Sequence, residues 1–239
     1  MFYLYYSDEG QGSFDYPSMK TIAYQIISDI PAVTRFYYPN GDSTDIVIRD
    51  NFGGTYAEES NGDITLSFAE NDDDALYAIY PDLSLLQFGD GDFSLSFWLN
   101  TTTNFSDPAL FGTMDWASSN NHGWILAWGG YDLRFVMTDA DGNKTDISWA
   151  EGNLPNYGVW HHIVVSVDRD GKTVIYIDGA AILDGNSSTP GSLDNGSPIH
   201  INQDSTGDYG DHFHGSYMDI RFFNYPLSAQ DVTDIYTGS

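Results

Sequence analysis

The chain has 239 residues, and 35 acidic against 8 basic side chains give it a formal net charge of −27 at pH 7. Such a charge repels phosphate backbones and anionic lipid headgroups, which argues against binding to nucleic acids or to membrane surfaces. The absence of cysteine excludes a disulfide framework, a thiolate zinc site and a cysteine nucleophile. No run of residues is long and apolar enough for insertion into a membrane.

The first 48 residues predict a small β-α-β-β unit that docks on something larger. Residues 2–6 are an aromatic strand candidate, and apolar residues over 17–31 then recur with helical spacing. Strand candidates at 33–38 and 45–49 follow, joined by a Pro-Asn-Gly-Asp turn. So small a unit has too little core to be stable by itself. We therefore expect it to pack on the main domain or on a partner chain.

The N-terminus also bears on where the protein works. It has no basic region ahead of its apolar residues and carries Asp8 and Glu9, so no secretory signal peptide is expected in this chain.

Residues 49–239 predict one all-β domain, an antiparallel β-sandwich of the jelly-roll type. Of the 35 acids 30 are Asp, which favours turns over helices. Turn chemistry is found, for example, at 168–171 and 184–186, and only 228–236 predicts a helical turn, with Ser228 as N-cap. The strand candidates are 63–69, 75–80, 93–99, 109–114, 124–128, 132–138, 145–149, 160–168, 172–178, 199–202 and 217–224.

Four motifs occur in a fixed order. They are GDFSLSFWL at 91–99, LFGT at 110–113, VWHHIVVSVD with TVIYIDG over 159–179, and FHGSYMDIRFFNYPLS at 213–228. In order and spacing they resemble the laminin-G-like family of concanavalin A-like lectin/glucanase jelly-roll domains. The resemblance covers roughly residues 50–239 and implies a jelly-roll domain that recognises ligands.

Two tryptophans and two histidines in these motifs invite a functional interpretation, but we expect scaffold roles. Trp98 and Trp160 lie in strands and are expected in the core. The adjacent His161 and His162 face opposite sides of a strand, so they cannot share a metal ion or a proton path. We expect one of them to be buried and hydrogen-bonded and the other to be exposed.

A glycoside hydrolase is the remote alternative, because the superfamily includes glucan hydrolases. The resemblance to these enzymes implies a Glu-x-Asp-x-x-Glu strand that carries two catalytic carboxylates. The chain has five Glu, and Glu70 opens the nearest match, but Ala75 stands where the second Glu belongs. We therefore predict a protein without catalytic activity.

A structural calcium on the convex side of the domain is a further implication of the resemblance. The late-strand ligand is Asp219, and Asp50, Asn51 and Asp63 are oxygen-bearing candidates from the start of the domain. The alternative for Asp219 is an ion pair with Arg221, which lies two residues on and on the same strand face.

Three polar stretches carry a large aromatic ring, the combination that suits a sugar with an apolar face and a hydroxyl rim. The candidate ligand-binding residues are Trp116, Asn121, His122, Trp128, Tyr131, Tyr209 and His212. The alternative for Trp116 is a loop anchor tucked onto the sandwich, and the alternative for Trp128 is a place in the core.

The sequence therefore predicts a non-catalytic, lectin-like module that binds a polysaccharide, a cell-surface glycan or another surface ligand outside the cell. The alternative is a virion structural protein, such as a tail fibre or a capsid decoration, that serves host attachment at the virion surface. In that case residues 1–48 dock onto other chains of a larger assembly. Packing of those residues on the sandwich itself favours the first interpretation.

Overall fold

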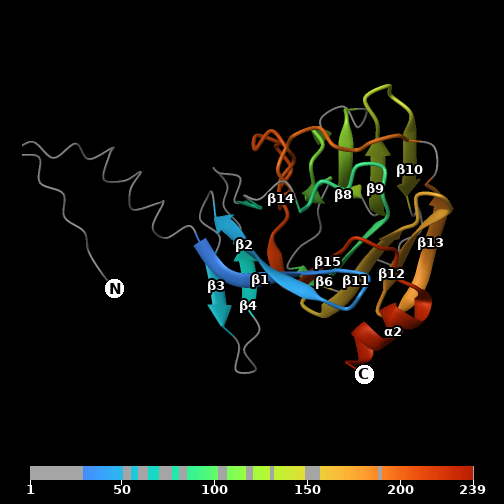
Figure 1. The fold of residues 1–239 in the computed structure, drawn as a ribbon. Helices are drawn as coiled ribbons and strands as arrows, with labels where there is room; N and C mark the ends of the chain where they lie inside the picture. The colour runs from blue at the N-terminus through green and yellow to red at the C-terminus, as the bar shows by residue number, and fades with distance from the viewer. Residues whose placement is uncertain are drawn as a thin grey trace, which may run out of the picture.

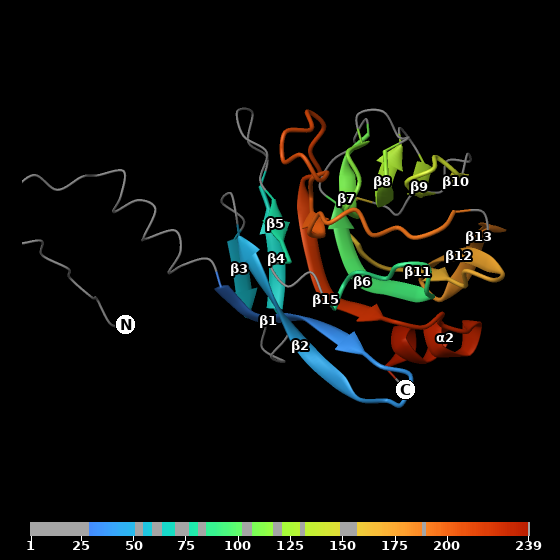
Figure 2. The same cartoon turned by 45° about the horizontal axis from the view of Figure 1, so that its top comes forward.

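The structure is a computed structural model, and within its described residues the chain forms a two-layered β-sandwich with a helix at its C-terminal end (Figures 1 and 2). The described residues are 29–50, 55–58, 64–69, 77–80, 85–101, 107–116, 121–129, 132–148, 157–187 and 190–238. No helix among them is long and apolar enough to cross a membrane.

Almost all of the described secondary structure is β-strand. The elements are β1 (Asp29–Tyr37), β2 (Ser43–Asp50), β3 (Thr55–Glu58), β4 (Ile64–Phe68), β5 (Ala78–Ile79), β6 (Phe93–Thr101), β7 (Ala109–Gly112), β8 (Gly123–Gly129), β9 (Asp132–Thr138), β10 (Lys144–Ser148), β11 (Trp160–Val167), β12 (Lys172–Ile177), β13 (Ala180–Asn186), β14 (His200–Ile201), β15 (Gly215–Phe223) and α2 (Ala229–Thr237). Each strand predicted from residue 33 onward overlaps one of these strands, which confirms the all-β prediction.

Two groups of strands make up the sandwich. The β8 layer has the strand order β10-β9-β8-β7-β14-β5, and the β6 layer has the order β15-β6-β11-β12-β13, with β4 and β3 attached to β15. The hairpin of β1 and β2 joins the layers, because β1 pairs with β15 and β2 pairs with β5. Among the described strands, β1 and β15 are the only parallel pair.

The core between the layers follows the alternation of side chains along each strand. In β6 the inward residues are Phe93, Leu95, Phe97 and Leu99, all of which are buried. In β8 the inward residues include Trp124 and Trp128, which belong to the same core cluster. The outer face of each layer is therefore formed by the remaining positions of each strand.

The first strand corrects the prediction for the N-terminal unit. The helix predicted over 17–31 is wrong at its end, because Asp29 to Pro31 belong to β1, where Asp29 and Ile30 pair with β2. Residues 1–28, with the strand predicted at 2–6, lie outside the described residues. The predicted boundary between residues 48 and 49 falls inside β2, so the described part of this unit is continuous with the sandwich. A docking role for residues 1–48 stays a prediction.

The last strand changes its partner halfway along. Residues 215–218 of β15 pair with β4, whereas residues from Ile220 onward pair with β1. The register of β15 against β6 shifts between Met218 and Arg221, and Asp219 takes a left-handed φ of 50°. Asp219 is therefore the extra residue of a β-bulge, which bends the strand from one partner to the next.

Two local details test the predicted turns and caps. The turn predicted at 184–186 is wrong, because these residues pair with β12 as the end of β13. The C-terminal helix is confirmed: Ser228 caps α2 and forms a reciprocal capping box with Asp231. Val232 of the helix is buried against the outer face of the β6 layer.

Candidate functional site

The outer face of the β8 layer carries a second, smaller apolar cluster. Its buried members are Ala109, Met114, Trp116, Ile125, Ala127 and Val136, and Tyr209 packs against them. Ile125, Ala127 and Val136 alternate with inward residues of β8 and β9, whereas Trp116 and Tyr209 come from loops. Two segments far apart in the sequence, around residues 107–116 and 203–212, thus meet on this face of the sheet.

Trp116 lies within this cluster and is only 3% exposed. Its backbone N–H donates to the Asp204 carboxylate at 2.9 Å, which fixes the loop to the 203–212 segment. Trp116 is therefore a loop anchor, and it does not offer an exposed ring face to a sugar. This corrects the prediction of Trp116 as a residue that binds a sugar, because its ring is almost fully buried.

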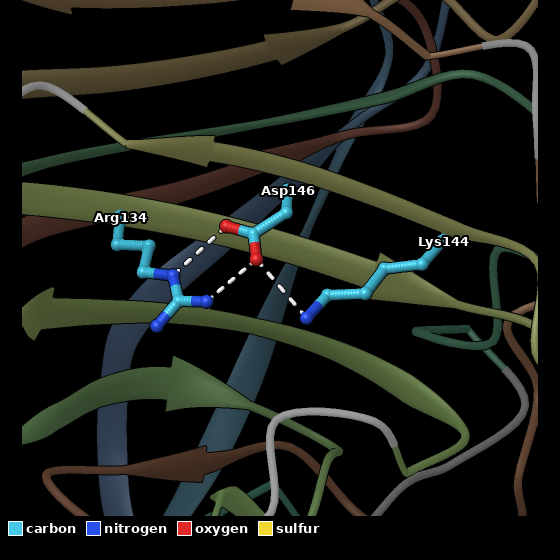
Figure 3. Close-up of polar contacts among 3 residues, drawn as sticks. All are labelled: Arg134, Lys144 and Asp146. Atoms are coloured by element: carbon cyan, nitrogen blue, oxygen red, sulfur yellow. Dashed lines mark hydrogen bonds and ion pairs between the residues drawn. The ribbon is translucent and has the colours of Figure 1, made fainter.

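Arg134 lies over the ring of Trp116, with the guanidinium carbon 5.0 Å from the ring centroid. On its other side Arg134 makes a bidentate ion pair with Asp146, in which Nε donates to Oδ1 at 2.8 Å and Nη2 donates to Oδ2 at 2.5 Å (Figure 3). The Nζ of Lys144 lies 3.0 Å from the same Oδ2. A planar guanidinium held by both a ring and a carboxylate has little freedom to move.

These three side chains come from neighbouring strands, and each keeps about a quarter of its surface exposed: 28% for Arg134, 23% for Lys144 and 29% for Asp146. The hydrogen bond from Arg134 is the main cause that lowers the pKa of Asp146, and it also raises the pKa of Arg134. Both partners therefore stay charged over the physiological range. Arg134 and Lys144 thus share one carboxylate oxygen, Oδ2 of Asp146. We call Arg134, Lys144 and Asp146 the Arg134 surface.

A second polar pair lies beside the cluster. The hydroxyl of Tyr209 donates to Oδ2 of Asp107 at 3.1 Å. Burial raises the pKa of both groups, and the nearby Asp211 carboxylate raises that of Asp107 further. The charge of Asp107 also acts on Arg134. The pair thus adds a hydroxyl and a carboxyl to the neighbourhood of the Arg134 surface.

The other predicted ligand-binding residues are only partly brought together. The Asn121 amide donates to the carbonyl of Asp115 at 3.0 Å, next to Trp116. His122 is hydrogen-bonded through Nε2 to the carbonyl of Ser192 at 3.0 Å, on a different loop. His212 is half-buried, and burial is the main cause that lowers its pKa.

Trp128 and Tyr131 complete the predicted set. Trp128 is 1% exposed in the main core, which corrects its prediction as a ligand-binding residue: inward alternation in β8 places the ring between the layers. Tyr131 lies outside the described residues.

The predictions missed Arg134, Asp146 and Asp107. The signal for the first two was available, because Arg134 and Asp146 occupy outward positions on the two strands of one hairpin, where Ser148 pairs with Arg134 and Asp146 with Val136. Opposite charges on neighbouring positions of one sheet face attract. Asp107 gave no such signal, since its place depends on a loop.

The histidine pair was predicted in part. His162 is buried and its Nε2 is hydrogen-bonded to Ser96 Oγ at 2.9 Å, as expected for one of the two. The exposed position expected for the other is wrong, because the His161 side chain is largely buried and its Nδ1 lies 2.7 Å from Asp178 Oδ2. Asp178 also accepts from the backbone N–H of His162, which ties the two histidines to one turn.

The core positions expected for Trp98 and Trp160 are also wrong. Phe97 and Leu99 point inward, so Trp98 between them points outward, and Trp160 lies on the same outer face of the β6 layer. Both side chains are only partly buried.

Of the four predicted calcium ligands, only Asp219 has a described side chain. Both carboxylate oxygens of Asp219 accept from Arg221, at 2.7 and 2.6 Å, which is the alternative that the sequence left open. Asp50 ends β2, but its side chain is not described, and Asn51 and Asp63 lie outside the described residues. In the described part of the chain no three His, Asp or Glu side chains converge as a metal site would need.

Comparison with known proteins gives a family and a fold. A family model, Laminin_G_3, described as the concanavalin A-like lectin/glucanases superfamily, matches residues 71–233. A search of curated proteins finds no match.

Several solved structures share the fold. The binding domain of botulinum neurotoxin serotype G matches with a TM-score of 0.61 and 18% identity, over 86% of this chain and 50% of that one. The binding domain of Paraclostridial Mosquitocidal Protein 1 matches with a TM-score of 0.63 and 19% identity, over 87% and 52%. A botulinum neurotoxin DC binding domain in complex with SialylT matches with a TM-score of 0.57 and 18% identity, over 89% and 52%. The chain thus spans about half the length of these structures, and the likeness concerns the fold alone.

Proposed function

The chain belongs to the concanavalin A-like lectin/glucanases superfamily, and from this premise we propose that it is a non-catalytic, lectin-like recognition module that binds carbohydrate. Three facts support the proposal. The solved structures that share its fold are named as binding domains. The sequence has Ala75 where the related hydrolases have their second Glu. The strong negative charge of the chain argues against nucleic acids as the ligand.

The Arg134 surface is the site that we assign to this function. The observation that carries the assignment is the fixed, partly exposed guanidinium of Arg134, held between the Trp116 ring and Asp146. Sugar hydroxyls both donate and accept hydrogen bonds. Arg134 and Lys144 supply donors, and Asp146 and the Asp107–Tyr209 pair supply acceptors on the same face. Because these groups are already ordered, little side-chain entropy is lost on binding.

The test is a glycan array with purified protein, run with and without calcium. We expect Arg134→Gln and Lys144→Gln to weaken binding about tenfold or more, since truncating a central polar contact typically costs about 1–2 kcal/mol or more. The matched control is Lys172→Gln, because Lys172 forms the same kind of cross-strand pair with Asp184, but on the outer face of the opposite layer. Melting curves show whether each variant is folded.

Two outcomes would contradict the assignment. If the parent protein binds no glycan on the array, the proposed carbohydrate binding is wrong. If the variants at Arg134 and Lys144 bind as the parent does and have the same melting temperature, the binding site lies elsewhere.

The remaining predictions belong with this proposal. We place the module outside the cell, where carbohydrate ligands are found. The structural calcium and the alternative virion role, with docking through residues 1–48, stay predictions. Light scattering separates the two roles, because an adaptor in a larger assembly forms a defined oligomer and a free binding module does not.

A further inference from the structure

The helix α2 covers only part of the outer face of the β6 layer. It packs through Leu227 and Val232 on a small cluster formed by Val164, Tyr176 and Phe223. Val164 pairs with Tyr176 across β11 and β12, and Phe223 ends β15. Toward the other end of β6, β11 and β15, the outward side chains stay partly exposed.

The strand register arranges these side chains in two adjacent rows. Met218, Trp98 and His162 form one row across β15, β6 and β11, and Ser216, Asn100 and Trp160 form the next. All of these except His162 keep part of their surface exposed. We call Trp98, Asn100, Trp160, Ser216 and Met218 the tryptophan face.

The position of Trp98 is fixed by ring contacts. Its ring lies 5.2 Å from that of His162 and 5.8 Å, nearly parallel, from that of Tyr236. His162 is in turn held by Ser96, and Tyr236 lies against the tight turn at Gly179, where an added Cβ would come within 3.0 Å of its ring. Trp98 is therefore ordered without a ligand, as a preformed contact surface requires.

The tryptophan face is electrically neutral, which is unusual in a chain of charge −27. Asp219, in β15, and Asp178, in the turn after β12, are paired with Arg221 and His161. The buried His162 is uncharged at pH 7, because burial lowers its pKa to about 4. A cationic partner finds no unpaired carboxylate among the described side chains of this face, and an anionic partner is repelled by the chain as a whole.

A neutral polymer with alternating apolar and hydroxyl-bearing surfaces fits this composition. Each sugar ring has an apolar face that suits an indole, and hydroxyls that suit an amide or a serine. The spacing of the strands, about 4.8 Å, repeats such contacts from β15 to β6 to β11.

We propose that the tryptophan face binds a neutral polysaccharide chain, with Trp160 and Trp98 against successive sugar rings and Asn100 and Ser216 bonded to their hydroxyls. This site goes beyond the proposed function, because it lies on the layer opposite to the Arg134 surface and does not use it. With both faces in use, one molecule joins two glycan segments, and simultaneous engagement raises the apparent affinity.

The test is native gel electrophoresis of the full chain in gels that contain hydroxyethyl cellulose, galactomannan or laminarin. We expect at least one of these neutral polysaccharides to retard the parent protein. Trp160→Ala weakens the interaction about tenfold or more, as is typical for a central tryptophan contact, and Asn100→Ala weakens it less. Lys172→Gln is retarded as the parent is, because Lys172 lies on β12, outside the tryptophan face and the Arg134 surface. Circular dichroism melting shows that the variants are folded.

Three results would overturn the proposal. The first is a parent protein that none of the three polysaccharides retards. The second is a folded Trp160→Ala protein that is retarded as much as the parent. The third is a parent dimer that Trp160→Ala converts to a monomer in light scattering, which assigns the face to self-association. The function proposed for the Arg134 surface is tested separately, because its readout is the glycan array with variants at Arg134 and Lys144.

Discussion

Acid sensitivity of folding is the sharpest prediction, and it centres on His162. The side chain is 1% exposed, contacts the rings of Trp98 and Tyr236, and has one hydrogen bond, to Ser96, among the described residues. Burial is the main cause that lowers its pKa from 6.5 to about 4, and the nearby charge of Arg221 adds to it. The imidazole is therefore neutral in the folded protein at pH values where the unfolded chain already takes up a proton.

The sign and size of the effect follow from this difference in pKa. Above pH 6.5 neither state is protonated, and the histidine gives no pH dependence. Between pH 6.5 and pH 4 the unfolded state binds the proton and the folded state does not. The free energy of unfolding therefore decreases as the pH is lowered through this range. Between about pH 7.5 and about pH 4.5 the loss is about 2.5 kcal/mol, at about 1.36 kcal/mol for each pKa unit.

The assay is urea unfolding at these two pH values for the parent and for His162→Phe. Phenylalanine keeps a ring in contact with Trp98 and Tyr236 but cannot take up a proton. Its loss of the bond to Ser96 lowers stability equally at both pH values, so it cancels when the pH dependence is compared. We expect the variant to lose about 2.5 kcal/mol less than the parent on acidification. His122→Gln, at a loop histidine, serves as the control and should follow the parent. Parallel losses in the parent and in His162→Phe would refute the reasoning.

The remaining predictions concern packing, capping and metal. Gly112→Ala should destabilise the fold by roughly 1–3 kcal/mol in urea, because the new Cβ would lie 2.5 Å from the Trp124 carbonyl oxygen; Gly210→Ala, which meets nothing within 4 Å, is the control. Ser228→Ala should cost about 1 kcal/mol through loss of the α2 cap, and Ser228→Asp should recover most of it. The predicted calcium requires that EDTA lowers the melting temperature and that calcium restores it; Asp219→Asn should not alter that response, because Arg221 engages both oxygens of Asp219. Identical melting curves remove the calcium site.

Much of the sandwich could be predicted from local patterns. The turn at Asp178 and Gly179, for example, has positive φ at both residues, as an Asp-Gly hairpin predicts. The parallel pairing of β1 with β15 could not be predicted, because it joins residues almost 190 positions apart, and no local periodicity records a distant partner. The helix predicted over 17–31 failed at its end for the same reason, since pairing with β2 and not local spacing decides the conformation of Asp29 and Ile30.

The sites show the same division between local and distant causes. The outward position of Trp98 was readable from its neighbours, because Phe97 and Leu99 must both face the core. Its place as a large aromatic residue within a strand instead suggested a buried position. The burial of Trp116 was not readable, because it depends on Asp204, which lies 88 residues further along and holds the loop in place. Aromatic residues in loops thus identify a region of the surface, but not which rings are exposed.

The place of β1 in the sheet has a mechanical consequence. The strand lies between β2 and β15, with a ladder of hydrogen bonds along each edge. A pull on the chain at Asp29 runs along the strand axis, so it loads many of these bonds in shear and does not peel them away one after another. A module that is tethered through residues preceding β1 therefore resists unfolding under a pulling force. A ligand bound on either outer face is then held by both layers of the sandwich.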